Sequence, residues 1–205
     1  MASQGGTVAF PTQARKHDLA STSDNDGAGT EAGASSVEVI GLDSNYERQS
    51  ETVALNGTTN APTTNSYIRL DRMKVLAAGS NGSKIGTITA TAQTDSTVTN
   101  QITIGENQSL YGIFTIPANK TGYMTDFYAS ADPSVTATIT VKLKIRPFGQ
   151  VWQTKQIIKI NDSVPYFKHS FNPPLKIDEK SDVKITVVSS ANNQVLDGGF
   201  DIIYE

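Results

Sequence analysis

The sequence predicts an all-β protein, an antiparallel β-sandwich of jelly-roll type with an extended N-terminal arm. From Val135 to Arg146, aliphatic and polar residues alternate without a break. From residue 36 onward, short strand-like runs are separated by turn residues at close spacing, as in sandwiches and barrels. No stretch shows a sustained period of 3.6 residues, so we expect very little helix.

The alternating run is the strongest of these observations. Side chains of an extended chain point to opposite faces at each step. Val141 and Leu143 would therefore face a core, while Lys142 and Lys144 would face water. A helix would scatter the same residues around its whole circumference. The run thus predicts a sheet with one buried face.

The other strands follow from shorter runs of the same kind, bounded by turn residues. We expect strands near residues 36–41, 50–56, 66–78, 84–93, 100–105, 109–116, 122–130, 135–146, 151–160, 165–171, 174–177, 182–189 and 198–204. Asn56-Gly57 supplies residues that tolerate positive φ, and so does Asn81-Gly82 within the predicted hairpin turn at residues 79–84. Pro173-Pro174 and Gly198-Gly199 are expected to interrupt strand pairing.

The first 35 residues differ in composition from the rest. Glycine, serine, threonine, aspartate and alanine dominate, and Val8, Phe10 and Leu19 are the large apolar residues after Met1. This composition allows disorder, but a partner or a sheet edge can hold such a segment in place. We therefore expect an N-terminal arm over residues 1–35 and a single β-sandwich domain over residues 36–205.

Composition and charge exclude several classes of function. The 205 residues include no cysteine, which removes disulfides, thiolate nucleophiles and cysteine-based zinc sites. With 17 basic and 20 acidic residues the formal charge is -3, so no broad field attracts nucleic acid. The N-terminus lacks the apolar run of a signal peptide, and no segment of about 18 apolar residues could span a bilayer. We expect no nucleic-acid or membrane partner, and a mature chain identical to the translated one.

The sequence offers little catalytic chemistry. His17 and His169 are the two histidines, without the spacing of a metal motif, and His169 is expected to be an ordinary strand residue. In a calcium loop with Gly27 at position six, Thr22 would occupy position one and Gly33 position twelve, so residues 24–27 are predicted to be a turn. We predict a protein that is not an enzyme and that uses no cofactor and no metal. Glycoside cleavage by carboxylates that meet only in space stays open as a third alternative.

The turn at residues 148–152 is the most apolar one in the chain. Aromatic side chains on loops favour contacts with a partner, although they can equally close the end of a core. The residues that we expect to contact a partner are Val8, Phe10 and Pro11 in the arm, and Phe148 and Trp152 in this turn.

Eight segments together carry a resemblance to a known family. They are VAFPTQA (8–14), STSDNDGAGT (21–30), GLDSNYERQSETVALNGTT (41–59), NSYIRLDRMKV (65–75), GIFTIPANKTGY (112–123), KIRPFGQVW (144–152), PLKIDEKSDVKI (174–185) and SANNQVLDGGFDIIYE (190–205). With them the chain resembles a family of virion structural proteins of tailed bacteriophages, especially marine and cyanobacterial phages. The resemblance spans almost the whole chain and includes the N-terminal arm.

The resemblance implies a place in the phage particle, assembled in the host cytoplasm. We expect a capsid decoration or cement protein that binds the outer surface of the head and stabilises the shell, working by surface complementarity without turnover. Its partners would be the major capsid protein or other virion subunits, and it would form a dimer or trimer. The alternative is a tail, collar or head-fibre component that attaches to host-surface carbohydrate.

Overall fold

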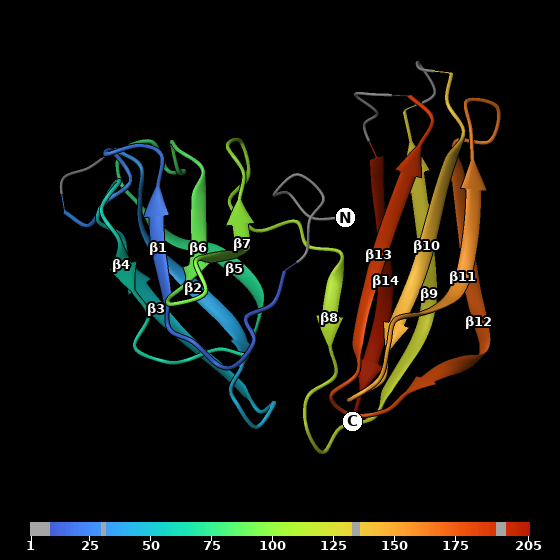
Figure 1. The fold of residues 1–205 in the computed structure, drawn as a ribbon. Helices are drawn as coiled ribbons and strands as arrows, with labels where there is room; N and C mark the ends of the chain where they lie inside the picture. Colours follow the sequence, from blue (N-terminus) through green and yellow to red (C-terminus); the bar gives the residue numbers. More distant parts are fainter. Residues whose placement is uncertain (1–8, 30–31, 133–135, 192–195) are drawn as a thin grey trace. The chain divides into compact units, whose positions relative to one another are not determined.

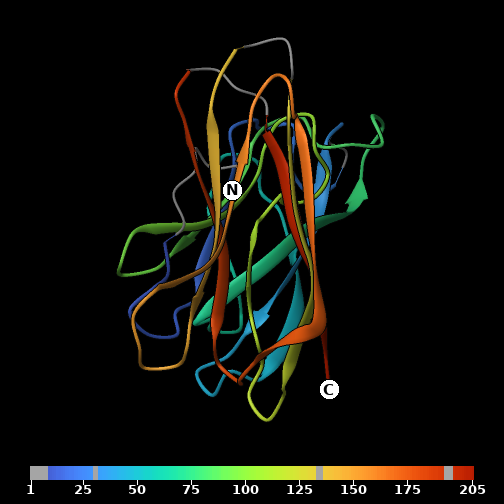
Figure 2. The same ribbon diagram turned by 90° about the vertical axis from the view of Figure 1, so that its right-hand side faces the viewer.

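The computed structural model describes residues 9–29, 32–132, 136–191 and 196–205. Within these ranges the regular secondary structure consists of β-strands, without a helix (Figures 1 and 2). All strand pairings are antiparallel. The predicted all-β antiparallel fold is therefore confirmed. The strands are β1 (His17–Ser21), β2 (Ala34–Leu42), β3 (Arg48–Ala54), β4 (Ala61–Pro62), β5 (Arg69–Ala78), β6 (Ile88–Ala92), β7 (Thr97–Ile102), β8 (Ile113–Thr115), β9 (Gly122–Ala131), β10 (Ile139–Arg146), β11 (Gln153–Ile160), β12 (Tyr166–Ile177), β13 (Asp182–Ser189) and β14 (Leu196–Tyr204).

The strands gather into two compact units, an N-terminal unit up to Tyr111 and a C-terminal unit from Gly112 onward. The N-terminal unit holds the sheets β4-β1-β6-β7 and β3-β2-β5, and the C-terminal unit holds β11-β10-β13-β8 and β12-β9-β14. In each unit, buried residues from both sheets form one hydrophobic cluster, which makes each unit β-sandwich-like. This grouping differs from the expected arm over 1–35 and single domain over 36–205, because each unit has a core of its own and β1 contributes to the first.

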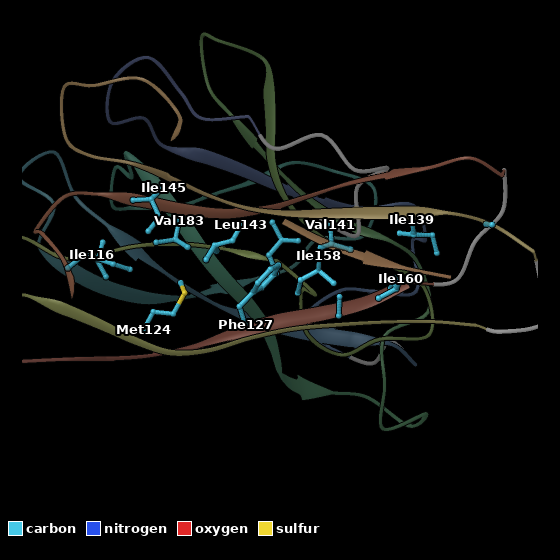
Figure 3. Packing of buried hydrophobic residues seen from close by; sticks show 14 residues of the cluster. Ile116, Met124, Phe127, Ile139, Val141, Leu143, Ile145, Ile158, Ile160 and Val183 are labelled. Atoms are coloured by element: carbon cyan, nitrogen blue, oxygen red, sulfur yellow. The ribbon is translucent and has the colours of Figure 1, made fainter. Parts of the chain in front are cut away.

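The core of the C-terminal unit follows from the alternation in β10. Ile139, Val141, Leu143 and Ile145 are buried, and the residues between them are partly exposed. Figure 3 shows this row facing side chains from the other sheet, among them Phe127. Fully burying one such aliphatic side chain contributes about 1.5–3 kcal/mol. The predicted buried face is thus confirmed for Ile139–Arg146, while Val135 lies outside the described residues.

The chain passes back and forth between the two sheets of the C-terminal unit. From β8 to β14, the β10–β11 hairpin joins neighbours within one sheet, and the other connections cross to the opposite sheet. The jelly-roll arrangement itself stays a prediction.

Of the two expected interruptions of strand pairing, the one at Pro173-Pro174 is confirmed and the one at Gly198-Gly199 is wrong. β12 continues through Pro173 and Pro174, but its pairing with β9 shifts register between Ser170 and Leu175, and residues 171–174 have no register partner in β9. Proline lacks a backbone donor, so an edge strand with an irregular register accommodates it. Gly199 lies in β14 opposite Tyr128, and a Cβ atom at this position would lie 2.5 Å from the Tyr128 hydroxyl oxygen. The glycine therefore makes room for the tyrosine ring and leaves the pairing intact.

Part of the expected arm is an inner strand of the N-terminal unit. β1 pairs with β6 along its full length and with β4 on its other side. Leu19 is fully buried in the core of this unit, and His17 is fully buried as well. The sequence HDLAS carries little intrinsic strand preference, so the position between two strands determines its conformation.

The loop after β1 is anchored by the buried carboxylate of Asp26. Its Oδ1 accepts hydrogen bonds from the backbone N–H groups of Ala34 (2.9 Å) and Ile85 (2.8 Å). Its Oδ2 accepts from the Ser21 hydroxyl (2.6 Å) and the Gly86 N–H (2.7 Å). Burial by itself raises the pKa of Asp26, but these hydrogen bonds outweigh it and hold the pKa below its usual value. One carboxylate thus fastens β1, the start of β2 and the segment before β6.

Asp26 also fixes the end of the segment at residues 79–84, which was expected to be a hairpin turn, through its hydrogen bonds to Ile85 and Gly86. β5 and β6 belong to different sheets, so the segment between them is a crossover and the hairpin prediction is wrong. Gly82 does have the positive φ expected for Asn81-Gly82, at 62°. Lys84 is buried and its ammonium group donates to the Gly86 carbonyl oxygen at 2.7 Å. Contacts that are distant in sequence therefore decide the course of this loop.

Replacing Asp26 with asparagine should destabilise the N-terminal unit by about 2–4 kcal/mol, because an amide cannot accept from donors on both sides and leaves buried N–H groups unpaired. Native-state hydrogen exchange of the β1 and β6 amides measures this change. The wild-type contribution should be present at neutral pH and be lost as the pH falls through the lowered pKa of Asp26, whose folded value lies below its unfolded value.

Asp24→Asn is the matched control, since Asp24 lies in the same loop but is exposed and bonds Thr58. It should cost less than about 1 kcal/mol. Equal losses in the two variants would contradict the anchoring role of Asp26.

Candidate functional site

The clearest candidate site is the loop that joins β10 to β11, at residues 147–152. The Gln150 N–H donates to the Pro147 carbonyl oxygen at 2.9 Å, and Gly149 has a φ of 72°, so the loop is a tight turn. Phe148 is 58% exposed and Val151 is 77% exposed at its tip. A short loop between two long paired strands presents these apolar side chains on a rigid support.

Cationic side chains surround the aromatic residues of this loop. The Arg146 guanidinium carbon lies 4.8 Å from the centre of the Trp152 ring, and the Lys184 ammonium nitrogen lies 4.0 Å from it. The Lys180 ammonium nitrogen lies 5.5 Å from the centre of the Phe148 ring. Cations within about 6 Å of a ring are attracted by its negative face. The loop is therefore an apolar tip with a positively charged surround.

Arg146 is held in position by a buried carboxylate. Its Nε donates to Asp182 Oδ2 at 2.9 Å, and a terminal nitrogen donates to the same oxygen at 2.5 Å. The Thr115 hydroxyl donates to the other oxygen of Asp182 at 2.7 Å. The Asp182 side chain is almost fully buried, while that of Arg146 is partly exposed, so the carboxylate is shielded from solvent and gives Arg146 a fixed orientation beside Trp152.

The predicted contact residues that the structure describes are divided between the two units. Phe148 and Trp152 lie together on the loop of the C-terminal unit, as described above. Phe10 belongs to the N-terminal unit, where the Arg69 guanidinium carbon lies 4.0 Å from its ring centre, and Pro11 is buried there. Val8 lies outside the described residues. Phe10 and Pro11 therefore pack within the fold, and Phe148 is the predicted contact residue with an exposed ring.

A second surface, which the sequence did not predict, is the outer face of the sheet β12-β9-β14. Strand register puts Tyr128 on this face beside Lys168 and Gly199, and puts Asp126 beside Ser170 and Asp201. Tyr166, 55% exposed, and Tyr123 extend the face in the two directions along β9. Alternation in the sequence gives the outward positions only separately on each side of residues 125 and 126, where the pairing with both neighbouring strands shifts register.

In the part of the chain that the structure describes, the titratable residues do not gather into a metal site. No group of three or more His, Asp and Glu side chains there could hold a metal ion. His169 lies in β12, with its ring centre 4.6 Å from that of Phe171, which confirms it as a strand residue. Within the same described ranges, no helix is long and apolar enough to cross a membrane.

His17 is the one strongly perturbed histidine among the described residues. Its Nδ1 lies 3.0 Å from the Arg15 carbonyl oxygen, and its buried Nε2 has no hydrogen-bond partner in the described ranges. Its ring meets the Tyr67 ring edge-on, with the centres 6.1 Å apart. Burial lowers the pKa of His17 from 6.5 to about 4, against the opposing effects of Arg15 and Asp18.

Comparison with known proteins gives no match to this chain among family models, curated proteins or solved structures.

His17 should make the N-terminal unit sensitive to acid. Its folded pKa lies below its unfolded pKa, so the unfolded state binds the extra proton as the pH falls from 6.5 to about 4, and stability is lost in that window. The expected loss is about 3 kcal/mol, at about 1.4 kcal/mol per pKa unit. Hydrogen exchange of β1 amides at pH 7, 5.5 and 4 measures it.

His17→Gln should flatten this dependence above pH 4, because glutamine does not titrate. A variant with the same pH profile as the wild type would exclude His17 as its origin.

Proposed function

We propose that this chain is a structural protein of a phage particle, a capsid decoration or cement protein that docks on the outer surface of the head and stabilises the shell. The resemblance to virion structural proteins of tailed bacteriophages supports the place in the particle. The exposed apolar tip of the β10–β11 loop supports docking as the mode of action.

The main support for docking is the combination of the exposed Phe148 and Val151 at the loop tip with the cations around Trp152 and Phe148. Aromatic and arginine side chains are enriched among the residues that dominate binding energy at protein interfaces. Phe148 and Val151 are exposed to water on a rigid turn, and a bound partner would bury them. A docking protein needs this complementarity and no turnover.

The proposed partners are the major capsid protein or other virion subunits. A capsid offers the same binding position many times, so a dimer or trimer of this chain would engage several positions at once and gain affinity through avidity. The crossing connections between β8 and β14 fit the proposed jelly-roll arrangement. Assembly would take place in the host cytoplasm, with the mature location on the virion.

A second candidate function rests on the outer face of β12-β9-β14. Tyr128 lies across Gly199, and the Asp126 carboxylate accepts from the Ser170 hydroxyl at 2.7 Å nearby. Flat aromatic rings beside carboxylates and hydroxyls suit the apolar faces and hydroxyl groups of sugars. This face supports the alternative, a tail, collar or head-fibre component that attaches to host-surface carbohydrate.

Replacing Phe148 with serine should weaken binding to heads that lack this protein by about 30-fold, the equivalent of about 2 kcal/mol for a dominant interface residue. Co-sedimentation with purified heads measures the affinity, and heating the heads with and without bound protein measures shell stabilisation. Ile104→Ser is the matched control, since Ile104 is 65% exposed but lies in the N-terminal unit. Wild-type protein that neither binds nor stabilises heads would exclude the cement function.

Replacing Tyr128 or Tyr166 with alanine tests the second candidate. If the chain attaches to carbohydrate, each change should reduce binding to purified host envelope polysaccharide at least tenfold, at about 1.4 kcal/mol lost per tenfold, while Phe148→Ser leaves it unchanged. Calorimetric titration measures the affinity, and the polymer length after incubation tests the hydrolase alternative. Polysaccharide that the wild type neither binds nor shortens would exclude both alternatives.

A further inference from the structure

The outer face of the sheet β11-β10-β13 carries an excess of positive charge. Alternation in β10 and the register with its neighbours put five cations on this side of the sheet. One carboxylate, Asp182, shares the face and is bonded to Arg146. We call this surface the cationic face, and its cations are Lys142, Lys144, Arg146, Lys159 and Lys184.

The four lysines of the cationic face have no carboxylate within ion-pair distance among residues 9–29, 32–132, 136–191 and 196–205. Lys74 and Lys168, on other sheets of the protein, do have one. The Lys74 ammonium nitrogen lies 2.7 Å from a Glu38 carboxylate oxygen, and that of Lys168 lies 3.0 Å from Asp126. The four lysines of the cationic face differ from these two in having no neutralising carboxylate.

The lysines also lie close to one another. Lys184 is directly opposite Lys144 on the neighbouring strand, and Lys142 and Lys144 are alternate residues of β10, about 7 Å apart. Burial lowers the pKa of Lys184, and the like charges of Lys144 and Arg146 lower it further. Like charges opposite each other destabilise a sheet. An anionic partner would relieve this repulsion.

Exposed apolar side chains lie between the cations. Ile157, opposite Lys142, is 51% exposed, and Val188, opposite Thr140, is 66% exposed. The loop with Phe148 follows directly at the end of β10. A uniformly anionic polymer offers these apolar side chains nothing to pack against, whereas a protein surface offers both carboxylates and apolar groups.

We propose that the cationic face docks on an acidic surface of a shell protein, with Lys142, Lys144 and Lys184 opposite carboxylates of the partner and Ile157 and Val188 packed on apolar side chains between them. This inference rests on the proposed function for the identity of the partner and adds the chemistry of its surface. Electrostatic complementarity of this kind speeds association and makes it sensitive to salt.

Charge reversal in the full-length chain tests the electrostatic part. The double variant Lys142→Glu/Lys144→Glu should bind purified heads at least tenfold more weakly than the wild type in 100 mM NaCl. Wild-type binding should weaken as NaCl rises from 50 to 400 mM. The matched control is Lys120→Glu/Lys176→Glu, which changes the net charge equally but lies outside this face. Circular dichroism checks that both variants are folded.

A second variant tests the apolar part and the nature of the partner. Ile157→Ser/Val188→Ser keeps every charge and should also weaken head binding at least tenfold. Single-stranded DNA and heparin serve as polyanion probes, and neither should compete with heads at 150 mM NaCl. Competition by either probe, with unchanged binding of the apolar variant, would overturn the protein partner in favour of a polyanion.

The outcomes separate this inference from the proposed function. Heads that bind the wild type and both charge variants equally would overturn the cationic face as the docking surface, while docking itself would stand. Heads that do not bind the wild type at all would overturn both. Loss of binding in the face variants alone, with retention in the matched control, would support both.

Discussion

The strict alternation of β10 is the constraint on which the C-terminal unit depends. One set of alternate residues, Ile139 to Ile145, must be buried for the two sheets to hold together. The other set, Lys142, Lys144 and Arg146, then has to face outward, because successive side chains of a strand point to opposite faces. The core and the cationic face are therefore two consequences of the same run of residues.

Much of the fold could be predicted because strand periodicity is a local property of the sequence. Apart from the two-residue β4, the strands from β2 onward lie where alternation and turn residues put them, although β12 joins two expected strands into one. β1 could not be found in this way. Its five residues have no strand pattern, and their conformation comes from β6 on one side, β4 on the other and the carboxylate of Asp26 beyond its end. The composition of residues 1–35 indicated an arm because such tertiary contacts leave no trace in composition.

The candidate site was predictable in part for a related reason. Phe148 and Trp152 could be selected because aromatic residues in a turn stand out in the sequence. Phe10 was selected on the same ground, but its ring packs under Arg69, a partner 59 residues away that no local pattern indicates. The cationic face was missed because a net charge of -3 averages over the whole chain. Alternation puts Lys142, Lys144 and Arg146 on one face, but only the register with β11 and β13 adds Lys159 and Lys184 to them.

Trp152 is the only tryptophan of the chain. Its indole lies at the junction of the apolar loop and the cationic face, with Lys184 and Arg146 close to its ring. Indole emission responds to nearby charge and to the loss of water around the ring. Trp152 is therefore an intrinsic fluorophore at the proposed docking surface. Any occupant of that surface can be followed optically, in real time and without a label.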